Sequence, residues 1–471
     1  MVIASIDLQG GRVVQLKQGS ELVLQRDNAV ELAEEFDRYG EVAVIDLDAA
    51  MGKGSNIELL RPLLRRARCR VGGGIRSPEQ ARELVSLGAE KIIAGSQVFR
   101  DPEKRGAGIA GGEFAVNIPF LEALIREIGR ERLIVAVDAG RRAGGGYEIT
   151  VDGWKTPTGL DLIEAARGVQ DFCGGLLFTC VDREGTMTGL DLEPVRALRD
   201  AVSCGITVAG GVNSVEEIEA AAALGCDVQL GMALYTGKVD LAEAFVRSLN
   251  WKKGAYAPGL ENSNTANIDI VNSDAADGNT VNSDTANNNT ARTLLPVIAQ
   301  SPGGQVLMTG FANREAVAES FKRGNLCFYS RTRNVLWMKG EHSGNTLALL
   351  RMRADCDRDA ILAVVEPAGP VCHTGAFSCF DTGRRYGLEF LQEIIAGRLR
   401  NPSPGSYTAA LDDDLVREKV MEEAEELCRA GTHDELVWEA ADLLYFTAVL
   451  MTRAGVKVEE VFDELDRRHK K

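Results

Sequence analysis

A short acidic segment in the second half of the chain combines three carboxylates with one thiol. Asp355, Asp357 and Asp359 occupy alternate positions, and Cys356 lies between the first two. On an extended chain successive side chains point to opposite faces, so we expect the carboxylates on one face and the thiol on the other. Carboxylate oxygens suit a hard cation such as Mg²⁺, whereas a thiolate suits Zn²⁺. The alternative for the aspartates alone is a solvated turn, because runs of charge are often solvated.

Cys372 and Cys379 follow Cys356 closely in the sequence and complete a group of three thiols. Three thiolates leave the fourth position of Zn²⁺ open to water, which is the arrangement of a catalytic zinc site. In a reducing cytosol such a group favours metal binding over disulfides. We assign His373, next to Cys372, to the same site as a catalytic residue, either as a ligand or as a general base; a purely structural histidine is the alternative.

A second acidic group lies on two helical stretches near the C-terminus. Residues three or four apart share one edge of a helix, and this holds for Glu422, Glu423 and Glu426 on one stretch. It also holds for Glu439 and Asp442 on the next. Antiparallel helices can present these carboxylates to Mg²⁺ ions that bridge a triphosphate. The alternative is a solvated acidic face, but Glu439 and Asp442 are embedded in apolar sequence, where unpaired acids are costly to bury.

The first half of the chain carries two aspartates and a doubled set of glycine motifs. Asp7 and Asp138 each follow an apolar run, and two acids placed around one substrate suit general acid–base catalysis. Backbone N–H groups at glycine turns ahead of helices bind phosphate, and their recurrence predicts a ligand with a phosphate at each end. The alternative is that the aspartates cap helices and the glycines only make turns. The residues assigned to phosphate binding are Gly73, Gly74, Arg76, Gly95 and Ser96 in the first half and Gly210, Gly211, Gly231 and Met232 in the second.

Short apolar runs that alternate with amphipathic stretches must position the residues of this first half. Such alternation predicts a parallel (β/α)8 barrel of the α/β class, in which strand ends face the active site. Asp7 and Asp138 then lie on opposite sides of one mouth. The recurrence of motifs at a nearly constant offset indicates a barrel built from two related halves. The expected strands include Val42–Leu47, Ile92–Ala94, Leu133–Val137, Leu176–Thr179, Ile206–Ala209 and Val228–Leu230.

Composition divides the 471 residues into three folded units and one linker. A stretch dominated by Asn, Asp, Thr and Ser cannot bury enough apolar surface to fold, so we expect a disordered linker. After it come short strands, with Leu294–Ala299 and Ile361–Glu366 as examples, and then long helices at Asp413–Arg429 and Asp434–Ala454. The expected segments are the barrel at 1–252, the linker at 253–292, a small β-rich α+β domain at 293–385 and an all-α domain at 386–471.

The whole-chain composition excludes several classes of function. Apolar residues make up 45% and charged residues 26%, which is typical of a globular protein. The net charge of −16 argues against nucleic-acid binding, which usually needs a basic face. The sequence has no long apolar run and no basic leader, so we expect no membrane contact and a cytoplasmic location.

The barrel region resembles a known family in five motifs, which are Ile6–Val14, Ile45–Ala50, Val71–Arg76, Ala136–Ala139 and Gly231–Lys238. Together they resemble phosphoribosylformimino-5-aminoimidazole carboxamide ribotide isomerase. The resemblance implies an Amadori rearrangement of an aminoaldose, with Asp7 as the base, Asp138 as the acid and Thr179 supporting the acid. The sister cyclase shares the barrel and the doubled phosphate loops. It ranks lower because it needs an ammonia-supplying partner and because the Leu234–Lys238 ending is similar to the isomerase.

Two features of the barrel region depart from the bacterial pattern of that family. The chain has Glu184 ahead of Gly185 and Thr186, where the family usually reads Asp-Gly-Thr. The carboxylate is kept on a longer side chain. The region Lys104–Asn117 is also rich in Gly and Ala, so we expect a different loop there.

The middle region resembles phosphoribosyl-AMP cyclohydrolase. Beyond the thiols and aspartates, the motifs that carry this resemblance are Gly310–Ala316, Tyr329–Arg333 and Leu336–Asn345. The resemblance implies hydrolytic opening of a purine ring by a zinc-activated water, and a homodimer in which both chains build each site. His342 stands where most relatives have Thr.

The C-terminal region, from Asn401 to Tyr445, resembles phosphoribosyl-ATP pyrophosphohydrolase of the all-α nucleotide pyrophosphatases. The resemblance implies cleavage of the α–β phosphoanhydride with release of pyrophosphate. The three families name consecutive steps of histidine biosynthesis on phosphoribosyl nucleotides, so we expect a multifunctional enzyme with Zn²⁺ and Mg²⁺ as cofactors and a dimer formed through the C-terminal domains. The alternatives are a catalytically silent barrel that serves as a binding or oligomerisation module, and a general nucleotide-cleansing pyrophosphatase at the C-terminus.

Overall fold

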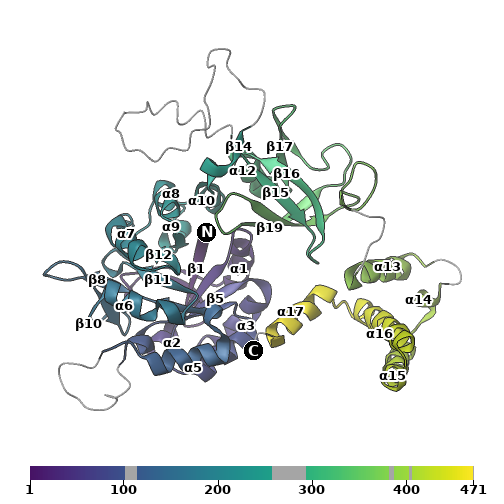
Figure 1. Ribbon diagram of the computed structural model, residues 1–471, viewed down its shortest axis with the longest axis horizontal. Helices are drawn as coiled ribbons and strands as arrows, with labels where there is room; N and C mark the ends of the chain where they lie inside the picture. The colour runs from purple at the N-terminus through teal and green to yellow at the C-terminus, as the bar shows by residue number, and fades with distance from the viewer. Residues whose placement is uncertain (101–113, 257–292, 381–386, 403–405, 470–471) are drawn as a thin grey trace.

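The computed structural model describes residues 1–100, 114–256, 293–380, 387–402 and 406–469. Within these ranges the chain forms three units in sequence order, which are a barrel, a smaller unit built on a mixed sheet, and a group of helices (Figure 1). The expected multidomain architecture, with a barrel followed by a β-rich unit and a helical unit, is confirmed.

Parallel strands close the N-terminal barrel. The first strand pairs in parallel with the second through Ala4 and Val42, and with the last through Val2 and Val228, so the sheet has no open edge along this path. The apolar runs found in the sequence are these strands, which are buried on both faces as parallel sheets require. The barrel strands are β1 (Val2–Gln9), β4 (Val42–Asp46), β5 (Cys69–Gly72), β6 (Lys91–Ala94), β7 (Leu133–Ala136), β11 (Gly175–Thr179), β12 (Gly205–Ala209) and β13 (Asp227–Leu230).

Helices surround these strands, and several of them are capped at the first turn by side chains that the sequence places there. Ser77 accepts a hydrogen bond from the backbone N–H of Gln80 in a capping box, and Pro78 occupies the first turn of the helix that follows. Asp161 and Asp240 cap two later helices in the same way. The helices are α1 (Ala29–Asp37), α2 (Leu47–Met51), α3 (Ile57–Arg66), α4 (Pro78–Leu87), α5 (Ile118–Ile128), α6 (Leu162–Val169), α7 (Leu192–Ala201), α8 (Val215–Ala223), α9 (Met232–Tyr235) and α10 (Leu241–Ser248).

Two antiparallel additions to the barrel were not predicted from the sequence. One hairpin, β2 (Arg12–Lys17) with β3 (Glu21–Arg26), extends from β1. The other is a three-stranded sheet of β8 (Ala139–Arg141), β9 (Tyr147–Val151) and β10 (Thr156–Asp161), which follows β7 and therefore rises from the same end of the barrel as Asp138. These strands are short and partly exposed, so they lack the long apolar runs by which the barrel strands were found.

The middle unit is a mixed sheet with one helix and one hairpin. Strand β15 pairs in parallel with β20 and antiparallel with β16, and β19 lies at the other side of β20. The strands are β14 (Ala255–Tyr256), β15 (Thr293–Gln300), β16 (Val306–Ala312), β17 (Cys327–Ser330), β18 (Val335–Met338), β19 (Leu347–Ala354) and β20 (Ile361–Pro367), and the helix is α12 (Arg314–Arg323).

The middle unit and the barrel share one hydrophobic core. Phe245, Leu249 and Trp251, which follow from the last helix of the barrel, are buried in the same apolar cluster as the sheet of the middle unit. The ring of Phe321 on α12 lies 4.5 Å from that of Tyr39 on the barrel and 5.3 Å from that of Phe245. The two units are therefore one packed body at this junction.

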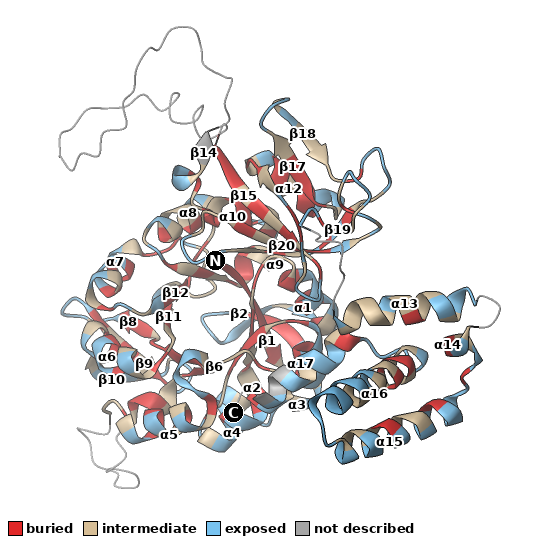
Figure 2. Cartoon of the chain, turned by 45° about the vertical axis from the view of Figure 1, so that its right-hand side comes forward, coloured by how far each residue is buried: buried red, intermediate tan, exposed pale blue. Residues whose placement is uncertain are grey.

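The helical unit has a much smaller core, which is formed mainly by Ile395, Leu411, Val416, Phe446 and Val449. Figure 2 shows few buried residues on these helices compared with the barrel. The last helix lies beside α4 of the barrel (Figure 2). The helices are α13 (Leu388–Arg400), α14 (Tyr407–Ala410), α15 (Asp413–Arg429), α16 (His433–Arg453) and α17 (Val458–His469).

Most of the expected linker, 257–292, lies outside the described residues. The described structure continues past residue 252 through a short helix, η6 (Trp251–Lys253), to Tyr256 in β14, which pairs with β15. The Gly- and Ala-rich loop expected at 104–117 also lies largely outside the described residues.

Candidate functional site

A cavity of about 320 Å³ opens at the carboxyl ends of the barrel strands. Both aspartates expected to act as acid and base line it: Asp7 near the end of β1 and Asp138 just after β7. The supporting Thr179 at the end of β11 lines it as well. All nine residues assigned to phosphate binding are also part of its wall. The structure thus brings together every barrel residue that the sequence singled out.

Asp7 is half-buried in the cavity wall, beside a hydroxyl group. Its carboxylate accepts a hydrogen bond of 3.1 Å from Ser5 Oγ. Burial, which disfavours the charged form, outweighs this bond and raises the pKa of Asp7 to about 6. A carboxylate with a pKa close to neutrality is suited to accept a proton and return it.

Asp138 is held by two donors. The indole Nε1–H of Trp154 donates to its carboxylate at 3.0 Å, and Thr179 also hydrogen-bonds to it. Burial nevertheless raises the pKa of Asp138, and the two hydrogen bonds oppose that rise. Trp154 was not found from the sequence, because its position depends on the β9–β10 turn, where its backbone has a φ of +69°. A tryptophan within a glycine-bearing turn, next to Gly153, was the only available signal.

Glu184 also lines the cavity, which therefore has four carboxylates in its wall together with Asp7, Asp138 and Asp152. Burial comes first among the causes that raise its pKa to about 8, followed by the charges of Asp7 and Asp138. Glu184 is therefore protonated and neutral at neutral pH. The backbone N–H of Gln18 donates to the Glu184 carbonyl at 3.1 Å, which ties this loop to the β2–β3 hairpin.

The glycine turns of the two halves have the same backbone geometry. Gly73 has a φ of +100° and Gly210 a φ of +96°. A Cβ atom at Gly73 would lie 2.2 Å from the Asp46 carbonyl oxygen, and one at Gly210 would lie 2.7 Å from the Cys180 carbonyl oxygen. Only glycine fits either position. The similar φ values and the close carbonyl oxygen at both positions show that the two halves carry matched glycine turns.

The second pair of turns begins short helices. Gly95 precedes the 3₁₀ helix η1 (Ser96–Phe99), and Gly231 precedes α9. Arg76 lies at the rim of the cavity, where its guanidinium donates to the carbonyl oxygens of Ala49 at 2.9 Å and Ala50 at 3.0 Å. Backbone N–H groups at the starts of helices, together with an arginine, can bind phosphate without a large basic surface.

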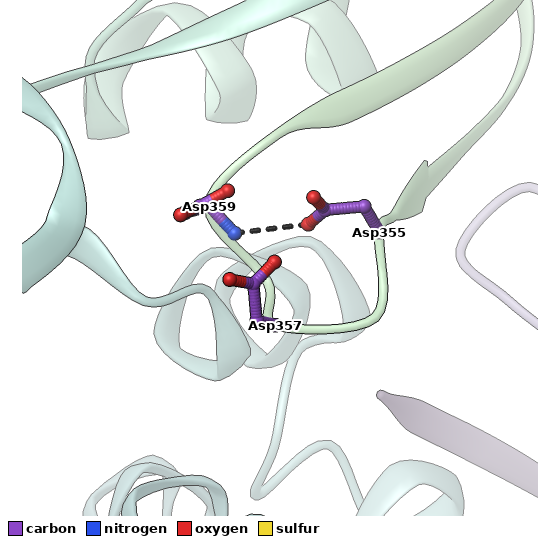
Figure 3. A group of neighbouring side chains, drawn as sticks. All are labelled: Asp355, Asp357 and Asp359. Atoms are coloured by element: carbon purple, nitrogen blue, oxygen red, sulfur yellow. Dashed lines mark hydrogen bonds between the residues drawn. The ribbon is translucent and has the colours of Figure 1, made fainter.

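The acidic segment of the middle unit forms a tight loop between β19 and β20. The expectation of an extended chain is wrong here, because Asp355 accepts hydrogen bonds from the N–H groups of Asp359 at 3.0 Å and Ala360 at 3.1 Å and so closes the loop. One oxygen from each of Asp355, Asp357 and Asp359 nevertheless lies within 4.8 Å of the others (Figure 3). This oxygen-only group fits a hard cation.

Two of the three thiols expected to bind zinc are neighbours. Cys372 and Cys379 lie close enough for each thiol to affect the pKa of the other, and Thr374 Oγ1 donates to Cys372 Sγ at 3.1 Å. The hydrogen bond from Thr374 is the largest cause that lowers the pKa of Cys372, which favours the thiolate form. His373 Nδ1 is 3.8 Å from Cys372 Sγ. Cys356 is exposed on the β19–β20 loop, and within the described part of one chain it does not join the other two thiols in a group of metal ligands.

Helices α15 and α16 bring the second acidic group together. Glu423, Glu439 and Asp442 have carboxylate oxygens within 4.8 Å of one another. Glu426 lies close enough to Glu439 to raise its pKa, whereas Glu422 lies beside this group and forms an ion pair with Lys419. Burial first, and then the neighbouring acids, raise the pKa of Glu439. Such mutual repulsion fits a site for divalent cations.

Among the residues that the structure describes, no helix is long and apolar enough to cross a membrane.

Three family models match the chain in the order of its units. The model described as histidine biosynthesis protein matches residues 1–240, phosphoribosyl-AMP cyclohydrolase matches 308–381 and phosphoribosyl-ATP pyrophosphohydrolase matches 388–469. The first match covers the barrel with its cavity, the second covers the aspartate loop and the thiols, and the third covers the carboxylates of α15 and α16.

Curated relatives match the C-terminal part of the chain. The histidine biosynthesis bifunctional protein HisIE of Bacillus subtilis is 41% identical over 191 residues, which are 37% of this chain and 91% of the relative. The HisIE protein of Bacteroides thetaiotaomicron is 41% identical over 186 residues, or 37% of this chain and 92% of the relative. That of Pyrococcus furiosus is 38% identical over 194 residues, or 38% of this chain and 92% of the relative. The chain therefore belongs to the histidine biosynthesis protein family, with a barrel of that family joined to a cyclohydrolase and pyrophosphohydrolase pair of the HisIE type.

Proposed function

We propose that this chain catalyses three consecutive steps of histidine biosynthesis. Its C-terminal domain converts phosphoribosyl-ATP to phosphoribosyl-AMP and pyrophosphate, its middle domain opens the purine ring, and its barrel isomerises the resulting aminoaldose. The observation that carries the proposal for the barrel is the enclosure of Asp7 and Asp138 in one cavity between two matched glycine loops.

In the barrel, Asp7 acts as the base and Asp138 as the acid. With a pKa of about 6, Asp7 is mostly ionised at neutral pH and accepts the proton from C2′ of the substrate. Asp138, oriented by Trp154 and Thr179, donates a proton to the ribose ring oxygen. The two glycine loops bind the two phosphates and so hold the sugar between the acids. Glu184 is neutral beside them and adds no charge that would repel the substrate.

In the middle domain, the residues that would hold zinc are Cys372 and Cys379 together with Cys356 of a second copy of the chain. Zinc would supply the activation of a water molecule for hydrolysis of the purine ring. The exposure of Cys356 and the contact between Cys372 and Cys379 support such a shared site. His373 is next to this site and would accept or relay a proton. The aspartate loop would hold Mg²⁺.

In the C-terminal domain, Glu423, Glu439 and Asp442, with Glu426 beside them, would hold Mg²⁺ against the triphosphate. Glu422, paired with Lys419, would act at the edge of this site. A homodimer through this domain is supported by large apolar side chains exposed on α15 and α16, which are Leu415, Met421, Leu436, Val437, Trp438 and Leu444. Contiguous exposed apolar residues mark protein interfaces.

Product analysis with phosphoribosyl-ATP as the only substrate tests this proposal. The parent protein should convert it to the isomerised aminoketose, and Asp7→Asn should stop at the ring-opened aminoaldose. If Asp7→Asn and the parent both stop at the aminoaldose, the barrel is a silent binding or oligomerisation module. Equal hydrolysis of ordinary nucleoside triphosphates would instead identify the C-terminal domain as a general nucleotide pyrophosphatase.

A further inference from the structure

The aspartate loop of the middle domain lies against the barrel. Its main chain is held there by Asn250, whose N–H donates to the Arg358 carbonyl at 2.8 Å and whose amide nitrogen donates to the Asp357 carbonyl at 3.4 Å. Lys253, in η6 beyond the last barrel helix, donates to the Asp357 carboxylate at 2.7 Å. The aspartate loop is thus bound by residues outside the region that matches the cyclohydrolase family model, which begins at residue 308.

Arg358 is the residue of this loop that enters the barrel. Its side chain is only 12% exposed and crosses to the end of the barrel opposite the cavity. Nη1 donates to the Ala222 carbonyl at 3.1 Å, and Nη2 donates to the Cys226 carbonyl at 3.0 Å. Because Ala222 lies in the last turn of α8, the positive charge also faces the negative end of that helix.

Asp227 completes the barrel half of this contact. Its carboxylate accepts a hydrogen bond of 2.9 Å from Arg358 Nη2 and forms an ion pair with the α-amino group of Met1. Asp227 is the first residue of β13, and Met1 precedes β1, whose Val2 pairs with Val228 where the barrel closes. Arg358 therefore ties the aspartate loop to the seam of the barrel.

The backbone of Arg358 shows that this contact shapes the loop. Its φ is +65°, in the left-handed region that residues other than Gly, Asn and Asp rarely adopt. This backbone conformation is strained for arginine, so the contacts that the Arg358 side chain makes with the barrel must offset the strain. The turn at Arg358 carries the chain from Asp357 to Asp359, and it therefore determines how these two carboxylates face Asp355 (Figure 3).

We propose that Arg358 is a positioning residue for the cyclohydrolase, and that the barrel, through Asp227, holds the aspartate loop in the form that binds a divalent cation. The barrel thus has a second role as the scaffold of a site in the next domain. This inference rests on the proposed function in one respect, namely that the cation at Asp355, Asp357 and Asp359 serves the cyclohydrolase. Partners of metal ligands that make no contact with the metal commonly set its affinity.

Two variants separate this role from simple folding. Arg358→Gly introduces a residue that adopts positive φ freely. It therefore removes the side-chain contact with the barrel without adding backbone strain. Asp227→Asn removes the negative charge on the barrel side of this contact, and Asp227 lies far from the isomerase cavity. Arg358→Lys retains a positive charge as the conservative variant. Lys322→Ala is the matched control, because it removes a cation of the same domain that is 76% exposed and pairs with Glu319 on its own helix.

The measurements are amide hydrogen exchange over residues 355–360 and Mn²⁺ titration, both in a Glu439→Gln background that removes the cation site of the helical domain. We expect Arg358→Gly and Asp227→Asn to exchange faster in this loop and to bind Mn²⁺ about 10- to 100-fold more weakly. Arg358→Lys should recover most of the affinity, and Lys322→Ala should match the parent. Isomerase turnover should be unchanged in all four variants.

Unchanged exchange and Mn²⁺ affinity in Arg358→Gly would overturn this proposal, as would an equal loss in Lys322→Ala. Failure of the proposed function looks different. A parent protein without cyclohydrolase turnover would contradict the cyclohydrolase assignment, while the exchange and Mn²⁺ measurements would still decide whether Arg358 shapes the loop.

Discussion

Phe321 of the cyclohydrolase domain packs against Tyr39 of the barrel, with ring centroids 4.5 Å apart. Phe321 is 5% exposed and also meets Phe245 edge to face at 5.3 Å. These three rings come from α12, from the segment after α1 and from α10, so they join elements of two domains. The apolar core of the cyclohydrolase domain is incomplete without the barrel residues that fill it.

Phe321→Ala should therefore destabilise the barrel and the cyclohydrolase domain together. Loss of a buried phenylalanine costs about 3–5 kcal/mol, because a cavity remains where its contacts were. Urea unfolding followed by circular dichroism should show one shared transition moving to lower urea. Phe462→Ala, which changes a phenylalanine that is 51% exposed on α17, is the control and should change stability little. A separate early transition of the cyclohydrolase domain, with the barrel unaffected, would contradict the shared core.

The sequence predicted the barrel, its strands and its cavity residues well, because parallel strands read as apolar runs and the glycine motifs occur twice. It did not predict the β8–β10 sheet, and so it missed Trp154 as a partner of Asp138. The role of an indole donor depends on a turn with positive φ, which leaves no periodic pattern in the sequence. The position of such a side chain is decided by tertiary packing rather than by local propensity.

The aspartate loop shows a different limit of sequence reasoning. The prediction that Asp355, Asp357 and Asp359 lie on one face of an extended strand was wrong, but their oxygens still lie close together because the segment forms a closed turn. Arg358 lies between two of these acids, and nothing in its spacing reveals that it reaches the barrel. Contacts between domains arise from the arrangement of whole units, which a local pattern does not contain.

Asp7→Asn and Asp138→Asn should each abolish most isomerase turnover. General acid–base catalysis contributes about 10²- to 10⁴-fold, so each variant should lose activity on that scale. Assay of the isolated aminoaldose substrate measures this step directly. Pyrophosphohydrolase and cyclohydrolase rates serve as internal controls and should remain at parental values, because both of their sites lie outside the barrel. Loss of all three activities in Asp7→Asn would instead indicate misfolding.

Glu184→Gln should stabilise the protein more at pH 8 than at pH 5. The pKa of Glu184 is about 8 in the folded state, against 4.5 for an unperturbed glutamate. Between these values the folded protein keeps a proton that the unfolded chain releases, so the free energy of unfolding falls as pH rises through this window. The slope for one such group is at most about 1.4 kcal/mol per pH unit. Glutamine does not titrate, so this loss is absent in the variant.

Thermal unfolding of the parent and of Glu184→Gln at several pH values measures this difference. The isomerase of the parent should also lose activity above about pH 8, because an ionised Glu184 would place a third negative charge beside the acid–base pair. The variant should keep its turnover there. Parallel melting curves at every pH would show that Glu184 does not carry its proton in the folded state.

Glu439→Gln should remove Mg²⁺-dependent pyrophosphate release and spare the other two activities. The oxygens of Glu423, Glu439 and Asp442 lie within 4.8 Å of one another, and burial with mutual repulsion raises the pKa of Glu439. Replacing one acid relieves that repulsion, so the variant should melt at a higher temperature than the parent without Mg²⁺. With Mg²⁺ the order should reverse, because the cation stabilises only the protein that binds it.

Glu425→Gln is the matched control for that experiment, because Glu425 lies on α15, the helix that carries Glu423, but forms an exposed ion pair with Arg429. It should keep both the activity and the Mg²⁺ response of the parent. A zinc-selective chelator added to the same proteins should stop ring opening, because it removes the zinc that Cys372 and Cys379 would hold. It should leave pyrophosphate release unchanged. Loss of the Mg²⁺ response in Glu425→Gln as well would mean that general surface charge causes the effect. A specific site requires the three carboxylate oxygens that α15 and α16 bring together.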